Sequence, residues 1–313
     1  MTAMKIALCI CTYKRPQQLE RLLCSFQNIR FGELKPEAVQ IMVVDNFPDG
    51  RTLAVCQRMQ KTLNLDLIYL SEYKTGETHS RNRAVDEALR LKFDFISFID
   101  DDDLPQPDWL ANLVAAQGKS GADIVCGAIP PVADSECPVW FKNSPLFEKE
   151  APGLRSKYGL PRNIGIGNSL IRCSLLEKVR SNGAVFTEEI VPDWDFFIRA
   201  TNSGATLIKT ENAIVHRSFG RQRATLKGYL KYAFQCGAMM SFLITTHGTA
   251  RQIAARKTKS FKKIRSCLVR LLLNANSKTG LTYNLFHLIK EVGVLYGYSG
   301  GKYRYLPQSK KKP

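Results

Sequence analysis

The chain has no glycine at the point where its first strand ends. The segment from Cys11 to Pro16 reads Cys-Thr-Tyr-Lys-Arg-Pro. A Rossmann turn for dinucleotides needs glycine there so that the backbone can approach a pyrophosphate, and a P-loop needs Gly-Lys-Ser/Thr. The short Gly165-Ile166-Gly167 run does not replace either motif. NAD enzymes and P-loop enzymes are therefore disfavoured, and a bound diphosphate would have to be met by a metal ion and basic side chains.

Long apolar runs and a cysteine framework are also missing. No uninterrupted apolar stretch reaches the roughly 18–20 residues that cross a bilayer, and Met1 to Lys5 leads into a strand without a signal-peptide pattern. The nine cysteines are scattered, without disulfide spacing. Cys9 and Cys11 alternate along an apolar strand, which is typical of core positions. We expect free thiols, a reducing compartment and a cytoplasmic location.

Acidic residues are nearly absent from the C-terminal region. Residues 251–313 contain 15 Lys and Arg but one acidic residue, Glu291, and this region supplies most of the chain's net charge of +17. Within 261–273 the basic residues alternate with aliphatic ones, and a single helical face holds Ile264, Leu268, Leu271 and Leu272. This pattern favours an amphipathic helix on an anionic membrane surface. The alternatives are a packed helix with a solvated basic side and, least favoured, a nucleic-acid-binding tail.

Strand and helix patterns alternate regularly along the chain. We predict strands over 5–11, 39–45, 66–70, 93–99, 123–129, 164–171 and 205–215. The predicted helices cover 16–28, 51–63, 77–91, 107–117, 174–179, 193–202 and 225–245. Such alternation predicts an α/β fold with a mainly parallel, Rossmann-like sheet flanked by helices. The Pro- and Gly-containing stretch 130–162 is expected to be a long loop.

Four consecutive aspartates, Asp100 to Asp103, follow the predicted strand that ends at Ile99. Open α/β sheets bind ligands at the carboxyl ends of their strands. Neighbouring carboxylates repel each other, and a hard divalent cation removes that cost. Because Asp100 and Asp102 project to the same side of an extended stretch, we predict that they share a Mg²⁺ or Mn²⁺ ion. The alternative is a solvated acidic turn that caps the next helix.

Several short motifs in a fixed order resemble the family 2 glycosyltransferases, a GT-A-fold group that builds bacterial polysaccharides. Besides the aspartate motif, they are the turn Thr12–Arg15, the segment Val43–Asn46, the helix Ser80–Ala84 and the acidic segment Val191–Phe196. The resemblance covers about residues 5–220, and Pro192 stands where the family has Glu in its acidic dyad. His216 and the Gly293–Gly297 segment resemble the succinoglycan- and capsule-type members most.

The resemblance implies an inverting, metal-dependent transfer of a sugar from a nucleotide-diphosphate donor to a saccharide or lipid-linked acceptor. It implies that Asp102, Asp100 and His216 hold Mn²⁺ or Mg²⁺. It implies a nucleotide-sugar site formed by Thr12, Arg15, Asp45, Arg81, Asp100 and Asp101. Asp193, with Asp195 as the alternative, is the implied general base. Each role has a structural alternative: a turn cap for Asp45, a surface charge for Arg81, an N-cap for Asp193 and a satisfied polar residue for His216.

Residues 1–225 are expected to form the catalytic domain, and residues 226–313 a basic helical extension that attaches to the inner face of a bacterial membrane. Trp140 and Phe141 either stack on a sugar ring or fill the core, and Asn168 is a weak candidate for a substrate contact. Three basic residues could meet a diphosphate or a lipid carrier, or be solvated: Arg217, Arg221 and Arg223. Two other functions stay open. They are a nucleotidyltransferase on a related fold, which should carry a Gly-rich basic loop after the first strand, and a non-catalytic saccharide- or nucleic-acid-binding protein.

Overall fold

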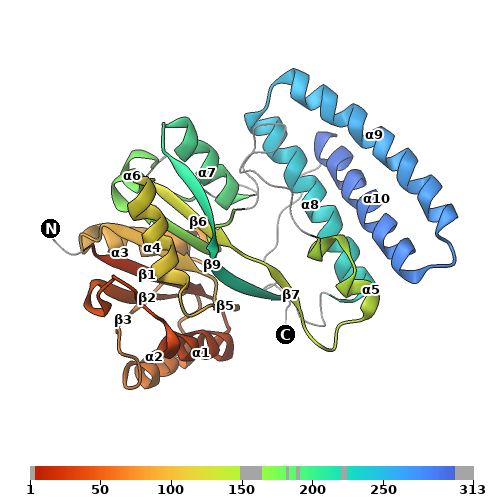
Figure 1. The fold of residues 1–313 in the computed structure, drawn as a ribbon. Coiled ribbons are helices and arrows are strands. Elements are labelled where there is room, and N and C mark those ends of the chain that lie inside the picture. Colours follow the sequence, from red (N-terminus) through yellow and green to blue (C-terminus); the bar gives the residue numbers. More distant parts are fainter. Residues whose placement is uncertain (1–3, 149–163, 181–182, 188–190, 220–223, 300–313) are drawn as a thin grey trace. The chain divides into compact units, whose positions relative to one another are not determined.

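The computed structural model describes residues 4–148, 164–180, 183–187, 191–219 and 224–299. The chain forms two compact units. The first consists of residues 1–130 and 163–217, and the second of residues 131–162 and 218–313. The first unit holds the sheet and its flanking helices, and the second holds the C-terminal helices (Figure 1).

The first unit is built on a mixed sheet with the strand order β3-β2-β1-β4-β8-β6-β9-β5. The strands are β1 Ile6–Thr12, β2 Val39–Asp45, β3 Asp66–Ser71, β4 Phe95–Ile99, β5 Asp103–Pro105, β6 Ile124–Ala128, β8 Asn168–Arg172 and β9 Leu207–Phe219. The first four in this order run parallel to one another. β8 is antiparallel to both of its neighbours. The predicted α/β class is confirmed, and the parallel part coincides with the stretch where strand and helix patterns alternate most regularly.

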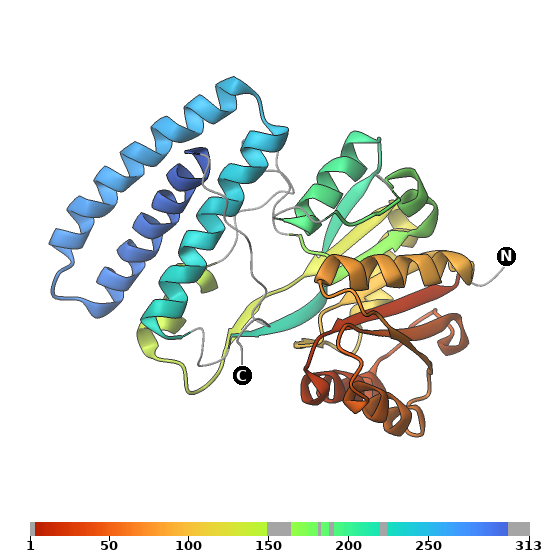
Figure 2. The ribbon, with the colours of Figure 1, turned by 180° about the vertical axis from the view of Figure 1, so that it is seen from behind.

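Helices cover both faces of this sheet because its strands bury both sides. One core takes Ile6, Leu8 and Ile10 of β1, and the other takes Ala7 and Cys9, as the period of two requires. Side chains from α1 (Pro16–Ser25), α2 (Arg51–Gln60) and α4 (Trp109–Ser120) fill the first core. Those of α3 (Glu77–Arg90), α6 (Cys173–Lys178) and α7 (Pro192–Asn202) fill the second. Figure 2 shows α3 lying across its face of the sheet. Two 3₁₀ turns complete the connections, η1 Phe26–Asn28 and η2 Pro36–Ala38.

The second unit packs three long helices: α8 Leu226–His247, α9 Ala250–Leu273 and α10 Lys278–Tyr298. Glycines let α8 and α10 meet backbone to backbone. A Cβ atom on Gly237 would overlap the Lys290 carbonyl, and one on Gly293 would overlap the Phe234 carbonyl. The Gly293–Gly297 segment therefore has a packing role, because only glycine permits this approach. In the part of the chain that is described, none of the helices combines the length and apolarity that a membrane span needs.

The second unit also contains the described part of the predicted loop over 130–162. It forms β7 (Pro131–Ala133), α5 (Val139–Lys142) and η3 (Pro145–Phe147). Trp140 and Phe141 are buried against Tyr229 of α8, with ring centroids 5.4 and 6.0 Å away. They fill this core, so the sugar-stacking alternative is not supported. This packing explains why residues 131–148 group with the C-terminal helices.

All nine cysteines are free, and Cys9 is fully buried, as the sequence predicted. The split of the chain into a catalytic part, 1–225, and an attachment part, 226–313, stays a prediction.

Candidate active site

The carboxyl ends of β1, β2 and β4 lie at one edge of the sheet because these strands are parallel. Thr12 at the end of β1 donates a hydrogen bond from Oγ1 to Asp101 Oδ2 at 2.8 Å. Arg15 donates from Nη1 to Asp101 Oδ1 at 2.9 Å and to Asp102 Oδ2 at 3.2 Å. The structure therefore brings together four predicted site residues, Thr12, Arg15, Asp101 and Asp102, at the edge where open α/β sheets bind ligands.

The carboxylates in this group differ in exposure. Asp101 is 5% exposed, and burial raises its pKa to about 6 although Arg15 and Thr12 lower it. The side chains of Asp100 and Asp102 are 34% and 35% exposed. Asp101 is thus fixed inside the turn, whereas Asp100 and Asp102 are open to a ligand.

Arg217 on β9 binds two aspartates of the motif at once. It lies opposite Asp103 in the β5–β9 ladder. Its Nε and Nη2 atoms donate to the two carboxylate oxygens of Asp103 at 3.1 and 2.7 Å, and Nη2 also donates to Asp100 Oδ2. Burial raises the pKa of the fully buried Asp103 to about 7, against the lowering effect of Arg217. The sequence analysis did not assign Asp103 or identify this pairing. The sequence could have indicated it only in general terms, because a carboxylate that becomes buried needs a cationic partner.

Gly167 leaves the space that Asp100 occupies. A Cβ atom at position 167 would lie 2.5 Å from Asp100 Oδ2. The next residue, Asn168, is fully buried and donates to the carbonyls of Ala128 and Ala213, both at 2.9 Å. Its Oδ1 accepts from Trp109 Nε1 at 2.8 Å. Asn168 therefore ties strands together, and its considered role as a substrate contact is not supported.

Asp45 is fully buried at the end of β2. Its Oδ1 accepts from the Phe47 backbone N–H at 3.0 Å, and its Oδ2 accepts from the Tyr69 hydroxyl at 2.9 Å. The turn-cap role is thus present in the structure. A contact between Asp45 and a nucleotide stays a prediction.

Arg81 of α3 connects to the acidic segment on α7. It is 4% exposed and forms ion pairs with Asp193 and, at 2.5 Å, with Glu77. The side chain of Asp193 is 29% exposed. Asp195 is buried and accepts from Arg199 Nε at 2.7 Å and from Thr187 Oγ1 at 3.0 Å. Asp193 is therefore the more accessible of the two candidate bases.

Asp193 does not cap its helix, since Val191 is the N-cap residue of α7 and no side chain caps it. The sequence analysis missed Glu77. Glu77 could have been identified from its position four residues before Arg81, because this spacing places both side chains on one face of a helix.

His216 lies next to Arg217 on β9, so the two side chains point to opposite faces of the strand. The His216 Nε2 atom lies 3.3 Å from Gln106 Nε2, and Nδ1 is buried without a partner among the described residues. Across the described ranges, no three His, Cys, Asp or Glu side chains converge as a metal cage. The structure does not bring His216 to Asp100 and Asp102, and its role as a ligand stays a prediction.

The motif order, the GT-A-like sheet and the family's sequence pattern agree. The sequence profile of Glycosyl transferase family 2 matches residues 7–180. The chain belongs to this family. It is a glycosyltransferase, and the resemblance drawn from its motifs is confirmed.

Three relatives illustrate what this glycosyltransferase is similar to. The succinoglycan biosynthesis protein ExoM of Rhizobium meliloti (strain 1021) is 26% identical over 240 residues, which cover 73% of this chain and 71% of ExoM. The mannosyltransferase PcManGT of Pyrobaculum calidifontis, solved with GDP-Man and Mn²⁺, has a TM-score of 0.64 at 14% identity, over 96% of this chain and 89% of that one. S. aureus TarS 1–349, solved with UDP-GlcNAc, has a TM-score of 0.52 at 16% identity, over 96% and 93%. The structural matches support the fold.

The donor atoms of the glycosyltransferase site fit a divalent metal that a substrate helps to hold. Mg²⁺ is commonly bound by one or two carboxylates together with substrate phosphates, and Mn²⁺ accepts the same oxygen ligands. Asp102 and Asp100 offer such oxygens, each on a side chain about a third exposed. These side chains offer oxygen ligands of the kind Mg²⁺ and Mn²⁺ use, and a shared metal site stays a prediction.

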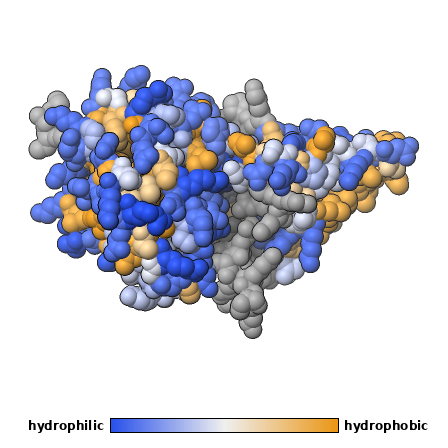
Figure 3. Space-filling model, turned by 90° about the horizontal axis from the view of Figure 1, so that it is seen from below, coloured by the Kyte–Doolittle hydropathy of each residue, from blue (hydrophilic) through white to orange (hydrophobic). Residues whose placement is uncertain are grey.

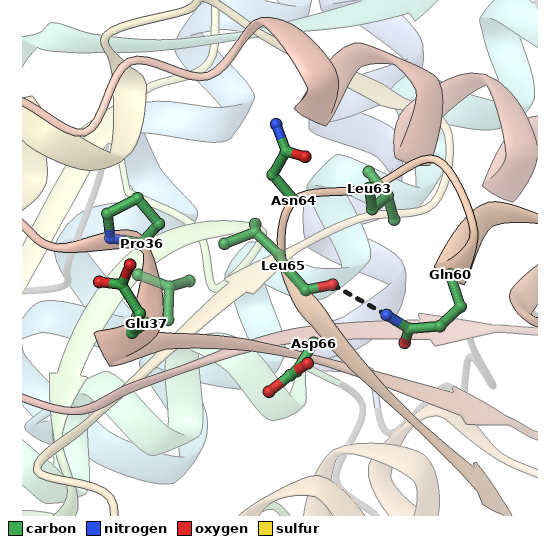
Figure 4. A pocket seen from close by; sticks show the side chains of 8 residues that line it. Pro36, Glu37, Gln60, Leu63, Asn64, Leu65 and Asp66 are labelled. Atoms are coloured by element: carbon green, nitrogen blue, oxygen red, sulfur yellow. Dashed lines mark hydrogen bonds between the residues drawn. The ribbon is translucent and has the colours of Figure 1, made fainter.

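A hollow at the other end of the strands does not compete with this site. It lies at the start of β2 and β3, where Pro36, Glu37, Asn64 and Asp66 line it (Figure 4). The Gln60 amide donates to the Leu65 carbonyl at 3.3 Å on its wall. Ligands of open α/β sheets bind at the carboxyl ends of the strands, and this hollow is at the amino ends.

Proposed function

We propose that this glycosyltransferase moves a sugar from a nucleotide-diphosphate donor to a saccharide or lipid-linked acceptor, with inversion, in the synthesis of a bacterial cell-surface polysaccharide. One observation carries the proposal. Accessible carboxylates, Asp100 and Asp102, stand at the ligand-binding edge of the sheet, and the same unit places the accessible Asp193 on α7. These are the groups that a departing diphosphate and an attacking hydroxyl require.

The nucleotide half of the donor is assigned to the edge formed by β1, β2 and β4. Thr12 and Arg15 line the base pocket, Asp45 reads the base edge, and Asp101 or Asp100 binds the ribose. PcManGT with GDP-Man and TarS with UDP-GlcNAc support a nucleotide-sugar donor. The role of ExoM in succinoglycan biosynthesis supports a polysaccharide product.

Charge and proton movements follow from these positions. Asp102 and Asp100 would hold Mn²⁺ or Mg²⁺, which would neutralise the charge that develops on the leaving diphosphate. Arg15 adds a fixed cation beside Asp102. Asp193 accepts the proton of the acceptor hydroxyl while the oxygen of that hydroxyl bonds to the anomeric carbon of the donor sugar. The bond from that carbon to the diphosphate breaks on the opposite side, so the configuration inverts.

Nucleotide release tests the proposal. The full-length enzyme is incubated with UDP-, GDP- and dTDP-sugars, with Mn²⁺ or with EDTA, and the freed nucleoside diphosphate is measured with an acceptor extract. We expect release from one donor class with Mn²⁺ only. Asp102→Ala should abolish it, and Asp193→Asn should slow it by about 10²–10⁴-fold, the usual contribution of a general base. Unchanged turnover in both variants would refute the assignment.

The same experiment separates the two other functions. A nucleotidyltransferase would release inorganic pyrophosphate, and the turn after β1 lacks the Gly-rich basic loop that this class needs. If the protein only binds saccharide, the Asp193→Asn variant should bind it as well as the wild type does, and neither should release nucleotide.

The second unit is proposed to attach the enzyme to an anionic membrane surface on the cytoplasmic side. On α9 the residues Phe261, Leu268 and Leu272 are 62%, 51% and 81% exposed. Their spacing of seven and four residues places them on one side of the helix, away from the buried Cys267. Figure 3 shows hydrophobic residues among the polar surface of the helices at its right-hand side. The exposed ridge is rotated from the predicted face, since Ile264 and Leu271 are half-buried.

Basic residues accompany this ridge. Lys257 and Arg265 are exposed on the same side of α9, and the helix contains no acidic residue. Apolar side chains that enter the lipid boundary, with cations at the headgroups, are the features of an interfacial helix. Co-sedimentation tests this attachment with vesicles of phosphatidylcholine with or without phosphatidylglycerol. The enzyme should bind only the anionic vesicles, and Leu268→Asp with Leu272→Asp should abolish binding without loss of nucleotide release. Binding that survives the double change would refute the surface.

A further inference from the structure

The guanidinium of Arg81 is buried between two carboxylates. Glu77 lies four residues before it on α3, and Asp193 approaches from the first turn of α7. Arg81 is 4% exposed, so water does little to stabilise its charge. A buried cation requires such partners, because leaving one unpaired costs several kcal/mol. Arg81 is therefore the fixed point around which both carboxylates are held.

The residue after Arg81 holds the segment that leads to α7. Asn82 Oδ1 accepts from the backbone N–H groups of Val185 and Phe186, both at 2.9 Å. Its Nδ2 donates to the Phe186 carbonyl at 2.7 Å. The Phe186 ring lies 5.6 Å from the Arg81 guanidinium and 5.2 Å from the Phe196 ring of α7. Two consecutive residues of α3 therefore fix the position of α7 and the direction of Asp193.

Asp193 is held through one oxygen only. Arg81 Nη1 donates to Oδ1, and the described residues give Oδ2 no hydrogen-bond partner. With its side chain 29% exposed, Asp193 can offer Oδ2 to an acceptor hydroxyl. We infer that Arg81 is a positioning residue for Asp193, rather than a contact for the nucleotide. The inference rests on the proposed role of Asp193 as the general base.

Glu77 has a part in this arrangement. When Asp193 takes up a proton, Arg81 loses one of its two anionic partners. Glu77 then keeps the buried guanidinium paired. The Glu77 side chain is 47% exposed, so water as well as Arg81 stabilises its charge.

Charged and titratable groups from several elements face Arg81 and Glu77. Besides the pair on α3 and Asp193 on α7, they are Cys11 on β1, Asp100 after β4 and Arg217 on β9. A cation near a carboxylate favours the ionised form. Loss of the Arg81 guanidinium therefore leaves Asp193 and Glu77 without their shared cation.

The test compares Arg81→Gln and Arg81→Lys with Arg83→Gln, a half-buried arginine on the same helix whose nearest carboxylate, Glu87, lies 3.8 Å away. Donor affinity is measured by calorimetry without acceptor, turnover by nucleotide release, and folding by circular dichroism. We expect Arg81→Gln to lower kcat by about 100-fold, the cost of misplacing a reacting group. The Kd for the donor should change by less than about threefold. Losing a direct contact worth about 1.4 kcal/mol would change it tenfold. Arg81→Lys should recover part of kcat, and Arg83→Gln should match the wild type.

Three results separate the outcomes. If Arg81→Gln weakens donor binding about tenfold or more and keeps kcat, Arg81 holds the nucleotide and the inference is wrong. If Asp193→Asn is inactive while Arg81→Gln shows normal turnover, only this inference fails. If Asp193→Asn turns over normally, the proposed general base fails first. Should Arg81→Gln not fold, Arg81→Lys and Glu77→Gln decide: a lowered kcat at an unchanged donor Kd supports the inference, and a weakened donor Kd at an unchanged kcat overturns it.

Discussion

Arg217 lies directly opposite Asp103 across the β5–β9 ladder and donates to both of its carboxylate oxygens. Asp103, the last aspartate of the motif, is fully buried, so these two hydrogen bonds from Arg217 compensate its charge. The same guanidinium reaches Asp100, which is open to a ligand. A single arginine thus connects the buried Asp103 to the accessible Asp100.

Replacing Arg217 should destabilise the first unit. Arg217→Gln leaves the buried Asp103 without its cation, and breaking a buried pair costs about 3–5 kcal/mol. Urea unfolding followed by circular dichroism measures this. Arg172→Gln, which removes a partly exposed pair with Asp123, is the matched control and should cost at most about 1 kcal/mol. Equal losses in the two variants would show that the Arg217–Asp103 pair contributes no more than a surface pair.

Gly167→Ala should impair use of the metal rather than folding. The added Cβ would stand 2.5 Å from Asp100 Oδ2 and push this carboxylate from its position. We expect the Mn²⁺ concentration for half-maximal nucleotide release to rise about tenfold or more, the size of effect seen when support of a metal site is lost. Gly165→Ala is the control, because its Cβ would meet only the Ile129 Cδ1 atom at 3.4 Å. An unchanged Mn²⁺ requirement in Gly167→Ala would separate Asp100 from metal binding.

Gly293→Ala should loosen the helical unit. Its Cβ would overlap the Phe234 carbonyl, and forcing atoms into a packed interior costs about 1–3 kcal/mol. Gly118→Ala lies in α4 with nothing within 4 Å of the added atom. That control should raise stability by about 0.5–1 kcal/mol, the difference in helix preference between the two residues. Thermal unfolding of both variants checks the opposite signs, and a stabilised Gly293→Ala would contradict the close packing of α8 and α10.

The buried carboxylate of Glu291 should make the helical unit sensitive to acid. Burial tends to raise its pKa, but Arg256 at 2.7 Å, with Lys263 and Ser260, lowers it below the usual value. A lowered pKa in the folded state stabilises the fold above the unfolded pKa of about 4.3, and this stabilisation is lost as the pH falls through the folded pKa.

Glu291→Gln should therefore remove this acid dependence and cost about 3–5 kcal/mol at pH 7, since it leaves the buried Arg256 uncompensated. Unfolding of the wild type and the variant is compared at pH 7 and below pH 4. If the difference in free energy does not shrink at the lower pH, Glu291 is not the group responsible.

Much of the first unit could be predicted because its signals are local. The strand predicted over 39–45 is β2 to the residue, and the helix predicted over 77–91 is α3 to within one residue. Apolar alternation and the βα order specify these elements. The edge that gathers Thr12 and Asp101 also follows, since parallel strands end on the same side.

The pairings inside the site could not be predicted in the same way. Arg217 meets Asp103 across 114 positions of sequence, and Arg81 meets Asp193 across 112. No local pattern says which of many arginines reaches which aspartate, and one residue's shift in register would turn a strand's side chain to the other face. For the same reason, the spacing of His216 and the aspartates did not reveal that their side chains fail to converge.

The tail posed a different difficulty. Its charge pattern predicted one amphipathic helix near 261–273, whereas α9 begins at Ala250 and α10 follows it from Lys278. The apolar face of α10 packs against α8 through backbone contacts at glycines, which carry no hydrophobic signal in the sequence.

The glycine contact between α8 and α10 has a consequence for how this unit tolerates change. Positions 237 and 293 accept no side chain at all, so mutation there is costly whatever the replacement. The outward side of α9 has no such restriction, because Phe261, Leu268 and Leu272 touch little of the protein. The exposed apolar and basic residues of α9 could therefore be replaced by others without disturbing the packing of α8 against α10.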